Sequence, residues 1–279
     1  MKKTILIGRG HLGMFLKSRL GIPDEFLYTG QLIDFPEFIK DHSNVDVVIN
    51  TAGKTDLKWC EENAREAAFC NIESTLKAFR AVDKRTLFVQ LSSGCVWDGP
   101  FPPIGLAFQP TMPPSPASFY SWTKAACDAL MLDESVERHV AILRPRQVYS
   151  PLPSARNTFT KLRTYARLID TQNSMTSAET IARTIEKLAS CPRHCFDGRI
   201  INVYEKGIYS PYKVGCLLAE AGLREMPVRL EKSELDVSLR PKRVDTVLFD
   251  WWFEDLVCPP DVDVELRRVI GEYKKNLSM

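Results

Sequence analysis

The chain has 279 residues, of which 37 are Lys or Arg and 35 are Asp or Glu, so its formal net charge is +2. This balance argues against a nucleic-acid-binding protein, which concentrates basic charge on one face. Hydrophobic residues make up 44% of the chain, which excludes an intrinsically disordered protein. No apolar run approaches the roughly 18 residues of a membrane-spanning helix, and the length predicts about two domains.

The N-terminus resembles a secretion signal only at first sight. Lys2 and Lys3 precede a short apolar stretch, but Arg9 and His11 interrupt it, and no small-residue cleavage site follows. The eight cysteines of the chain show no framework spacing. We therefore expect a cytoplasmic protein with reduced thiols.

One cluster of metal-ligating residue types occurs, at Cys191, His194 and Cys195. Structural zinc sites need a second pair of ligands at a similar spacing. The sequence offers none, so we interpret the segment as a loop with two thiols and expect no metal site.

Strand and helix patterns alternate through the first half of the chain. The expected strands are Lys3–Gly8, Phe26–Thr29, Val45–Asn50, Thr86–Leu91 and Val140–Arg144, and the expected helices are His11–Leu20, Glu62–Val82 and Tyr120–Leu132. Such alternation predicts βαβ units and a parallel sheet, whose buried strands are apolar throughout. The expected fold is therefore α/β and Rossmann-like, with a doubly wound parallel sheet.

The second half of the chain is less regular. It shows helical patterns at Thr180–Ala189, Pro211–Ala221 and Val264–Tyr273 and a strand pattern at Ile200–Tyr204. We expect a dinucleotide-binding domain over residues 1–148, to which residues 176–205 return. A smaller C-terminal substrate lobe would then consist of residues 149–175 and 206–279.

A glycine-rich loop joins the first strand to the first helix. Its sequence is Gly8-Arg9-Gly10-His11-Leu12-Gly13, which is G-x-G-x-x-G. The first glycine permits a tight turn, the second lets the backbone approach a pyrophosphate, and the third lets the helix pack against the strand. The free N–H groups at the start of the helix then hold the diphosphate. The loop therefore predicts a bound dinucleotide cofactor.

The choice between the two nicotinamide dinucleotides depends on the end of the second strand. An acid there would select the free ribose hydroxyl of NAD, but the strand ends with Tyr28, Thr29 and Gly30. Arg9, inside the glycine loop, could reach the 2′-phosphate of NADP, although a solvated side chain is the alternative. We expect NADP and keep NAD as the alternative.

Tyr120 and Lys124 form a Y-x-x-x-K sequence on a predicted helix. Residues four apart share a helical face, so the ammonium can stabilise the phenolate and bring the phenol closer to useful acid strength. A second match, Tyr209 with Lys213, contains Pro211 and follows the last predicted strand, so we set it aside.

Ser93 follows the predicted strand Thr86–Leu91, at the edge of the sheet where parallel α/β folds bind ligands. By itself it is typical of a turn at the end of a strand. After the glycine loop and before Tyr120 and Lys124, it instead predicts a hydroxyl that binds a substrate carbonyl while the tyrosine delivers a proton.

With these residues in place, the chain resembles the extended short-chain dehydrogenase/reductases, and within them the dTDP-4-dehydrorhamnose reductase group. The matching segments are the glycine loop, Asn50–Asp56 (NTAGKTD), Cys70-Asn71, Leu91–Gly99 (LSSGCVWDG), the Tyr120/Lys124 pair, Leu143–Tyr149 (LRPRQVY) and Asn157-Thr158-Phe159. The resemblance is strong to about residue 160 and faint beyond it.

The resemblance implies roles for individual residues. Ser93 would be the catalytic Ser/Thr, Tyr120 the general acid, and Lys124 the residue that holds the nicotinamide ribose. Further cofactor contacts would come from Thr51, Ala52, Gly53, Asp34, Phe35, Pro145 and Gln147. Substrate contacts would come from Thr55, Gly94, Cys95, Gln147 and Asn157.

The implied function is an NAD(P)H-dependent reductase of a nucleotide-linked 4-keto-6-deoxy sugar, with no nucleic-acid or membrane partner. A homodimer is left open. Gly94 and Cys95 stand where the group has Asp-Tyr, and Gln147 stands where it has Trp, so the identity of the sugar is also left open.

Three other functions are considered. A sugar 4,6-dehydratase would need an acidic pair after Ser93, which is absent. A bifunctional epimerase-reductase resembling GDP-fucose synthase would use Cys95 and a histidine, yet no histidine lies between His139 and His194. A non-catalytic NADP-binding regulatory subunit is the third, because a fold does not fix a function.

Overall fold

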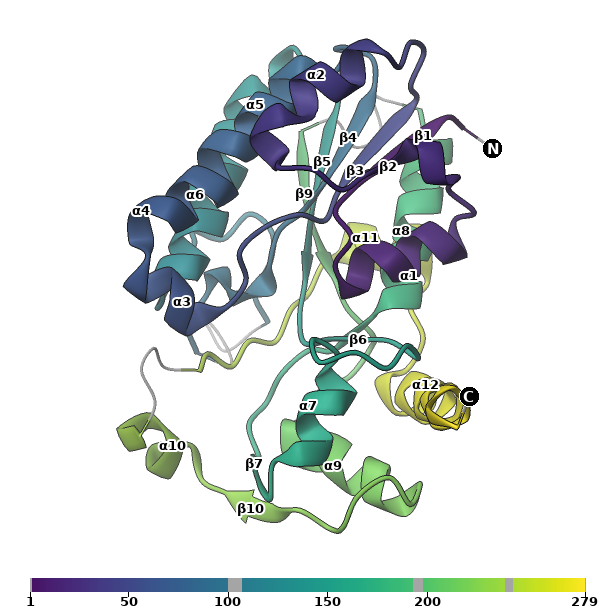
Figure 1. Ribbon diagram of the computed structural model, residues 1–279. Helices are drawn as coiled ribbons and strands as arrows, with labels where there is room; N and C mark the ends of the chain where they lie inside the picture. The colour runs from purple at the N-terminus through teal and green to yellow at the C-terminus, as the bar shows by residue number, and fades with distance from the viewer. Residues whose placement is uncertain (1, 100–106, 193–197, 239–242, 279) are drawn as a thin grey trace.

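The computed structural model describes residues 2–99, 107–192, 198–238 and 243–278. A six-stranded sheet lies at its centre (Figure 1), with strands β1 (Thr4–Ile7), β2 (Leu27–Tyr28), β3 (Val47–Asn50), β4 (Leu87–Leu91), β5 (Val140–Pro145) and β9 (Arg199–Val203). The strand order is β2-β1-β3-β4-β5-β9, and every neighbouring pair is parallel. The expected Rossmann-like parallel sheet is confirmed.

Helices cover both faces of the sheet (Figure 1). One face carries α2 (Phe35–Lys40), α5 (Ser74–Ala81) and α6 (Phe119–Asp133), and the other carries α1 (His11–Arg19), α8 (Ala178–Ser190) and α11 (Trp251–Val257). Along β1, Leu6 packs into the core beneath α1 and α8, whereas Ile5 and Ile7 pack into the core beneath α2 and α5. Burial on both faces is the reason that these strands are apolar throughout.

The helix expected over Glu62–Val82 is interrupted. The chain instead forms α3 (Leu57–Glu62), α4 (Ala64–Ala68), a π-helical segment (Phe69–Glu73) and then α5. Asn63 leaves the helical conformation and ends α3. A π-helical turn keeps an amphipathic pattern nearly intact, so the hydrophobic spacing did not reveal it. Its effect is to bury the polar side chain of Asn71, and such turns are frequent at functional sites.

The edge of the sheet beside β1 is short. The strand expected over Phe26–Thr29 has only two residues, because Phe26 belongs to a 3₁₀ turn, and residues 32–40 form another 3₁₀ turn and α2 instead of a further strand. The chain leaves β1 toward β2 on one side and returns as β3 on the other. This change of direction places a ligand crevice at the carboxyl ends of β1 and β3.

A second group of elements lies below the sheet in Figure 1. It contains the paired strands β6 (Val148–Tyr149) and β8 (Thr176–Ser177), the paired strands β7 (Arg167–Ile169) and β10 (Val228–Leu230), and helices α7 (Thr158–Thr164), α9 (Pro211–Glu220), α10 (Lys232–Ser238) and α12 (Val262–Leu277). Phe159, Leu218 and Tyr273 are among the buried residues of its separate hydrophobic core.

One segment departs from the expected substrate lobe over residues 206–279. Leu248, Phe253 and Val257 belong to the same hydrophobic core as Leu6 of the central sheet, and α11 packs against α8 and β9. The chain therefore returns to the sheet a second time before α12. Apolar residues are frequent between Val244 and Val257, but their pattern does not show which of the two hydrophobic cores they join.

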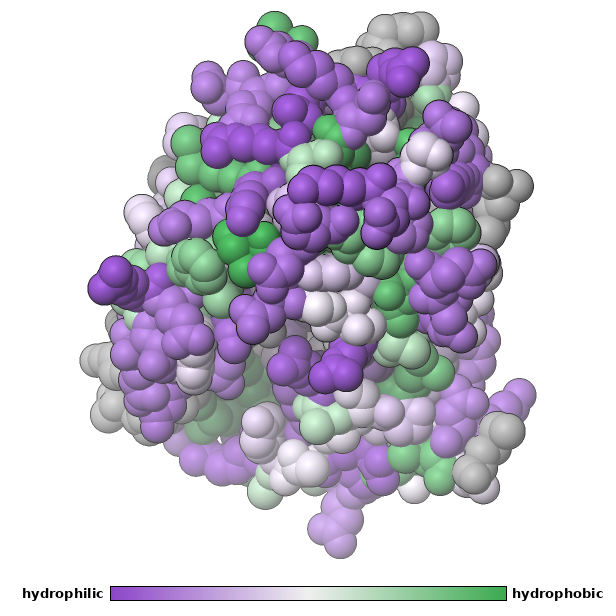
Figure 2. Space-filling model, turned by 45° about the horizontal axis from the view of Figure 1, so that its top comes forward, coloured by the Kyte–Doolittle hydropathy of each residue, from purple (hydrophilic) through white to green (hydrophobic). Residues whose placement is uncertain are grey.

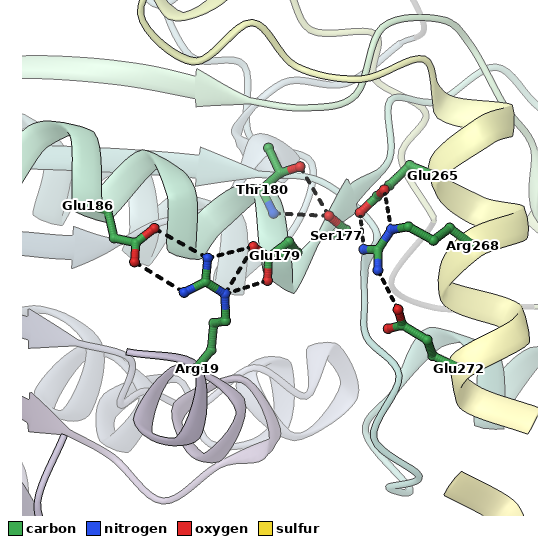
Figure 3. A network of polar contacts seen from close by, with 8 residues as sticks. All are labelled: Arg19, Ser177, Glu179, Thr180, Glu186, Glu265, Arg268 and Glu272. Atoms are coloured by element: carbon green, nitrogen blue, oxygen red, sulfur yellow. Dashed lines mark hydrogen bonds and ion pairs between the residues drawn. The ribbon is translucent and has the colours of Figure 1, made fainter. Parts of the chain in front are cut away.

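Ion pairs tie α8 to α1, and others form along α12 (Figure 3). Arg19 of α1 binds Glu179 (2.8 Å) and Glu186 (3.1 Å) of α8. On α12, Arg268 binds two glutamates of its own helix. Ser177 caps α8 by accepting a hydrogen bond from the Thr180 N–H (3.0 Å). The Arg19 contacts join segments about 160 residues apart and fix α8 beside the glycine-loop helix.

Hydrophilic residues predominate on the face shown in Figure 2, and hydrophobic residues are scattered among them. Within the part of the chain that the structure describes, no helix combines the length and the apolar character needed to cross a bilayer.

Candidate active site

The glycine loop has the shape that a diphosphate requires. Gly8 has φ +105°, a conformation that favours glycine, and a Cβ on Gly13 would collide with the Gly8 carbonyl oxygen. A Cβ on Gly10 would meet nothing within 4 Å, so this side of the loop is open. Helix α1 begins at His11 with no side-chain cap and no acid in its first turn. Its free N–H groups therefore suit a diphosphate.

The other loop residues point in different directions. Arg9 is exposed, whereas Leu12 packs against the main core. The His11 Nε2 lies 2.9 Å from the Ser150 hydroxyl, just after β6. Burial, together with the nearby Lys161, lowers the pKa of His11. We infer that a neutral His11 holds the loop in place, which leaves Arg9 as the loop side chain available for a 2′-phosphate.

The loop after β3 is held on both sides. Thr51 donates from its hydroxyl to the Ile7 carbonyl oxygen (2.8 Å) of β1. The Asn71 side chain accepts from the Lys54 N–H (2.8 Å) and donates to the Lys54 carbonyl oxygen (3.0 Å). A Cβ on Gly53 would lie 3.6 Å from the Lys124 Nζ, so the loop runs directly past the lysine. Ala52 is half-buried beside them.

The Ser, Tyr and Lys side chains come together at the carboxyl end of the sheet. Tyr120 and Lys124 are buried one turn apart on α6. The Lys124 Nζ donates to the Leu91 carbonyl oxygen (3.0 Å) at the end of β4. Ser93 follows two residues later, and its hydroxyl accepts from the Cys95 N–H (3.1 Å) and lies close enough to Tyr120 to affect the pKa of the phenol.

Burial sets the protonation of this group. It raises the pKa of Tyr120 well above its ordinary value, and the neighbouring Cys95 raises it further, whereas the Ser93 hydroxyl lowers it. Burial also lowers the pKa of Lys124. The phenol is therefore protonated at neutral pH, as a general acid requires.

The second Y-x-x-x-K match has no such surroundings. Helix α9 begins at Pro211, so Tyr209 precedes the helix and does not share a helical face with Lys213. Its hydroxyl donates to the Asp263 carboxylate (2.8 Å) on α12. We therefore continue to set this match aside in favour of Tyr120 and Lys124.

Cys95 has a charged partner. The Arg146 Nη1 lies 2.8 Å from the Cys95 Sγ, and Arg146 also binds the Asn173 amide oxygen (2.6 Å) and the Val244 carbonyl oxygen. Gln147 is half-buried beside Arg146 and has φ +47°. The contact therefore places a guanidinium directly against the thiol.

Other predicted contact residues lie differently. Asn157 is fully buried, where it caps α7 and donates to the Ser150 and Leu152 carbonyl oxygens (both 2.8 Å). Phe35 is fully buried in the core, and Gly94 is buried against Leu248. These three residues present little or no free surface to a ligand. Asp34, Thr55 and Pro145 lie on the exposed start of α2, on the exposed loop after β3, and at the end of β5.

Two residues near the site were missed in the sequence. Asn71 was noted in the sequence only as part of a segment that matches the reductase group. In the structure it binds the backbone of the loop after β3 and also donates to the Thr123 hydroxyl (3.1 Å) on α6. The Lys161 side chain is exposed, and partial desolvation of its ammonium, followed by the charges of Arg243 and Arg156, lowers its pKa. A single lysine on a short helix is an ordinary surface residue, so the sequence did not indicate that Lys161 lies near the site.

A metal site receives no support. Within the described residues, no group of three or more His, Cys, Asp or Glu side chains is arranged to hold a metal ion. His194 and Cys195 of the cluster noted in the sequence lie outside the described residues.

Comparison with known proteins identifies the family. The model of the NAD dependent epimerase/dehydratase family matches residues 20–182, more than half of the chain. The chain belongs to this family. Within it, the chain is 31% identical over 159 residues to an Arabidopsis thaliana bifunctional dTDP-4-dehydrorhamnose 3,5-epimerase/dTDP-4-dehydrorhamnose reductase, covering 53% of this chain and 52% of the relative.

A second relative is similar over a longer stretch. An A. thaliana trifunctional UDP-glucose 4,6-dehydratase/UDP-4-keto-6-deoxy-D-glucose 3,5-epimerase/UDP-4-keto-L-rhamnose-reductase is 32% identical over 185 residues, covering 62% of this chain and 27% of the relative. The chain thus spans about half or less of these curated relatives. The UDP-rhamnose synthase of Acanthamoeba polyphaga mimivirus has the same fold, with a TM-score of 0.84, 20% identity, and coverage of 98% and 100% of the two chains.

Proposed function

We propose that this protein is an NADPH-dependent reductase of a nucleotide-linked 4-keto-6-deoxy sugar. The observation that carries the proposal is the buried Ser93, Tyr120 and Lys124 cluster, which lies beside an open glycine loop at the carboxyl edge of the sheet. The printed activities of the Arabidopsis relatives support the choice of substrate class. A purely regulatory NADP-binding protein would have no need of this cluster.

The residues divide the work between binding and proton transfer. The glycine loop and the N-terminus of α1 would hold the diphosphate of the cofactor, whose nicotinamide supplies the hydride when bound. Ser93 would donate a hydrogen bond to the ketone oxygen, and Tyr120 would protonate that oxygen as it becomes an alkoxide. Lys124 would contact the nicotinamide ribose, and its charge would favour the phenolate that forms when Tyr120 gives up its proton.

NADP is proposed over NAD because no acid ends β2 and because Arg9 is exposed at the loop. The direct test is reduction of dTDP-4-dehydrorhamnose and of UDP-4-keto-L-rhamnose, followed by the loss of nicotinamide absorbance with NADPH and with NADH. Oxidation of NADPH coupled to formation of the 4-hydroxy sugar is expected. Stoichiometric NADPH binding without turnover on either sugar would favour the regulatory alternative.

A second activity at the same site is favoured by the Cys95–Arg146 contact. Epimerisation beside a ketone needs one group to remove a carbon-bound proton and another to return a proton on the opposite face. The sequence lacks a suitable histidine, but Lys161, whose pKa is lowered, offers a second titratable group. The charge of Arg243 contributes to the lowered pKa of Lys161, and the carbonyl oxygen of the next residue, Val244, accepts a hydrogen bond from Arg146. We propose Cys95 and Lys161 as this pair.

A further inference from the structure

Asp128 is a buried carboxylate for which the proposed reaction has no direct use. It lies on α6 one turn beyond Lys124 and two turns beyond Tyr120, on the same helical face, and it is 1% exposed. Its Oδ2 accepts hydrogen bonds from the Ser92 hydroxyl (2.9 Å) and the Arg144 Nε (2.8 Å).

Stability alone gives no reason for this ion pair. Taking two charges out of water is costly, and a buried pair is worth its cost only with good geometry and full hydrogen bonding. Here the contact is single, since the Asp128 Oδ1 and the Arg144 Nη1 are buried without a hydrogen-bond partner. The guanidinium instead lies over the Trp97 ring, 4.8 Å from its centroid.

The contacts of Asp128 lead to the reacting groups. Ser92 directly precedes Ser93, and its N–H donates to the Leu143 carbonyl oxygen (2.8 Å) of β5. Lys124 binds the carbonyl oxygen of Leu91. Two residues of α6 one turn apart therefore hold two successive residues at the end of β4, just before Ser93.

We propose that Asp128 is a positioning residue of the active site, which fixes Ser93 through Ser92 and places a carboxylate one helical turn from Lys124. This role rests on the proposed reductase function. Arg144 of β5 orients the Asp128 carboxylate, and the Trp97 ring holds Arg144 in place. These contacts connect α6 to β5.

The electrostatic part of this role has a definite sign. Lys124 is faced by Asp128 and Cys127 on its own helix and by Cys60 on α3, and all three raise its pKa against the lowering effect of burial. Asp128 also raises the pKa of Tyr120, together with Cys95 and Cys60. Removing the Asp128 charge therefore lowers both pKa values and shortens the alkaline range in which the lysine is charged and the phenol protonated.

Asp128→Asn tests the proposal, because the amide oxygen can still accept from Ser92 and Arg144 while the charge is lost. The titration of Lys124 is followed by NMR of its ε-carbon in full-length protein labelled with [13C]lysine, the signal being the one missing from Lys124→Met. The Lys124 midpoint is expected to fall in Asp128→Asn. Asp250→Asn is the matched control, because Asp250 is a buried carboxylate that caps α11. The Lys124 midpoint should not move in this variant.

Kinetics provide the second readout. With NADPH and dTDP-4-dehydrorhamnose, Asp128→Asn should lower kcat about tenfold, leave KM within about threefold and move the alkaline limit of kcat to lower pH. Asp128→Glu restores the charge and should restore the Lys124 midpoint. If the wild-type protein reduces no nucleotide-linked keto sugar, the proposed function fails, and the Lys124 titration still tests Asp128.

Two more variants separate positioning from ion pairing. Asp128→Asn combined with Arg144→Gln leaves no unpaired charge, and the low kcat and low Lys124 midpoint should persist. Ser92→Ala keeps both charges and should lower kcat several-fold without moving the midpoint. An unchanged midpoint in folded Asp128→Asn, wild-type behaviour of the double variant, or wild-type kcat in Ser92→Ala would each overturn the proposal.

Discussion

The Arg146 guanidinium lies 2.8 Å from the Cys95 Sγ, although the two residues are 51 positions apart in the chain. Arg146 is buried, directly follows β5, and is held on its other side by Asn173. Its direction toward the thiol is therefore fixed. The contact gives Cys95, otherwise a small half-buried residue, a cationic neighbour at the site.

Cys95→Ser tests the epimerase activity. In heavy water, the wild-type protein should introduce deuterium at the carbons flanking the ketone, as detected by mass spectrometry of the product, and Cys95→Ser should not. Reduction of an already epimerised substrate should stay within about tenfold, because no reducing step uses the thiol. Cys216→Ser, a change at a half-buried cysteine of α9, is the matched control. If the wild-type product carries no deuterium, the protein is a reductase alone.

Tyr120→Phe removes one oxygen and leaves the packing of the ring. We expect kcat to fall by roughly two or more orders of magnitude, as when a positioned acid is lost, with little change in NADPH affinity measured by fluorescence titration. Tyr209→Phe, which loses only the hydrogen bond to Asp263, should keep full activity. Normal turnover in Tyr120→Phe would assign the acid to another group.

The glycine loop offers a pair of substitutions with opposite readouts. Gly13→Ala places a Cβ against the Gly8 carbonyl oxygen, so it should destabilise the folded protein by about 1–3 kcal/mol and lower Tm. Gly10→Ala places its Cβ in open space, so Tm should change little while NADPH binding weakens. Thermal unfolding and fluorescence titration measure the two effects. Equal NADPH affinity in Gly10→Ala and wild type would move the diphosphate away from this loop.

Stability should depend on pH through Glu205, a fully buried residue that accepts a hydrogen bond from the Ser177 N–H (2.8 Å). Burial raises the pKa of Glu205 from 4.5 to about 7. The folded protein therefore retains a proton that the unfolded chain releases, so stability from this group falls as pH rises from about 4.5 to 7.

Glu205→Gln stays neutral at every pH. Its Tm should accordingly exceed that of wild type by a few degrees at pH 8 and match it at pH 5. Glu179→Gln, at a half-buried carboxylate that binds Arg19, should change Tm by an amount that is equal at pH 5 and pH 8. A Glu205→Gln variant that is less stable at pH 8 than wild type would contradict this view of the carboxylate.

Much of the central sheet could be predicted because its signal is local. Val45–Asn50 and Val140–Arg144 are apolar on both faces, which only a buried parallel strand requires. The same locality explains why Tyr120 and Lys124 could be paired, since four residues on a helix fix their shared face. Ser93 could be placed beside them only through the rule that the carboxyl ends of parallel strands meet at one edge.

The remaining features depend on contacts between distant segments. Arg146 reaches Cys95 and Asp128 reaches Ser92 only after β4, β5 and α6 have packed together. The Asn157 amide could bind a ligand, yet its N–H groups donate to backbone carbonyl oxygens before α7 and its oxygen accepts from the Phe159 N–H. Residue type alone cannot show whether an amide binds a ligand or satisfies the backbone beside it.

The two-residue strand β2 has a consequence for the lifetime of the bound cofactor. Only the two-residue strand β2 lies beyond β1 at this edge of the sheet, so the surface against which an adenosine could pack is small. The Tyr28 hydroxyl on this surface already donates to the Gln31 carbonyl oxygen (2.7 Å). A dinucleotide would then be retained chiefly through its diphosphate. We expect oxidised and reduced cofactor to exchange freely with the surrounding pool between turnovers, so that the redox state of that pool sets the direction of the reaction.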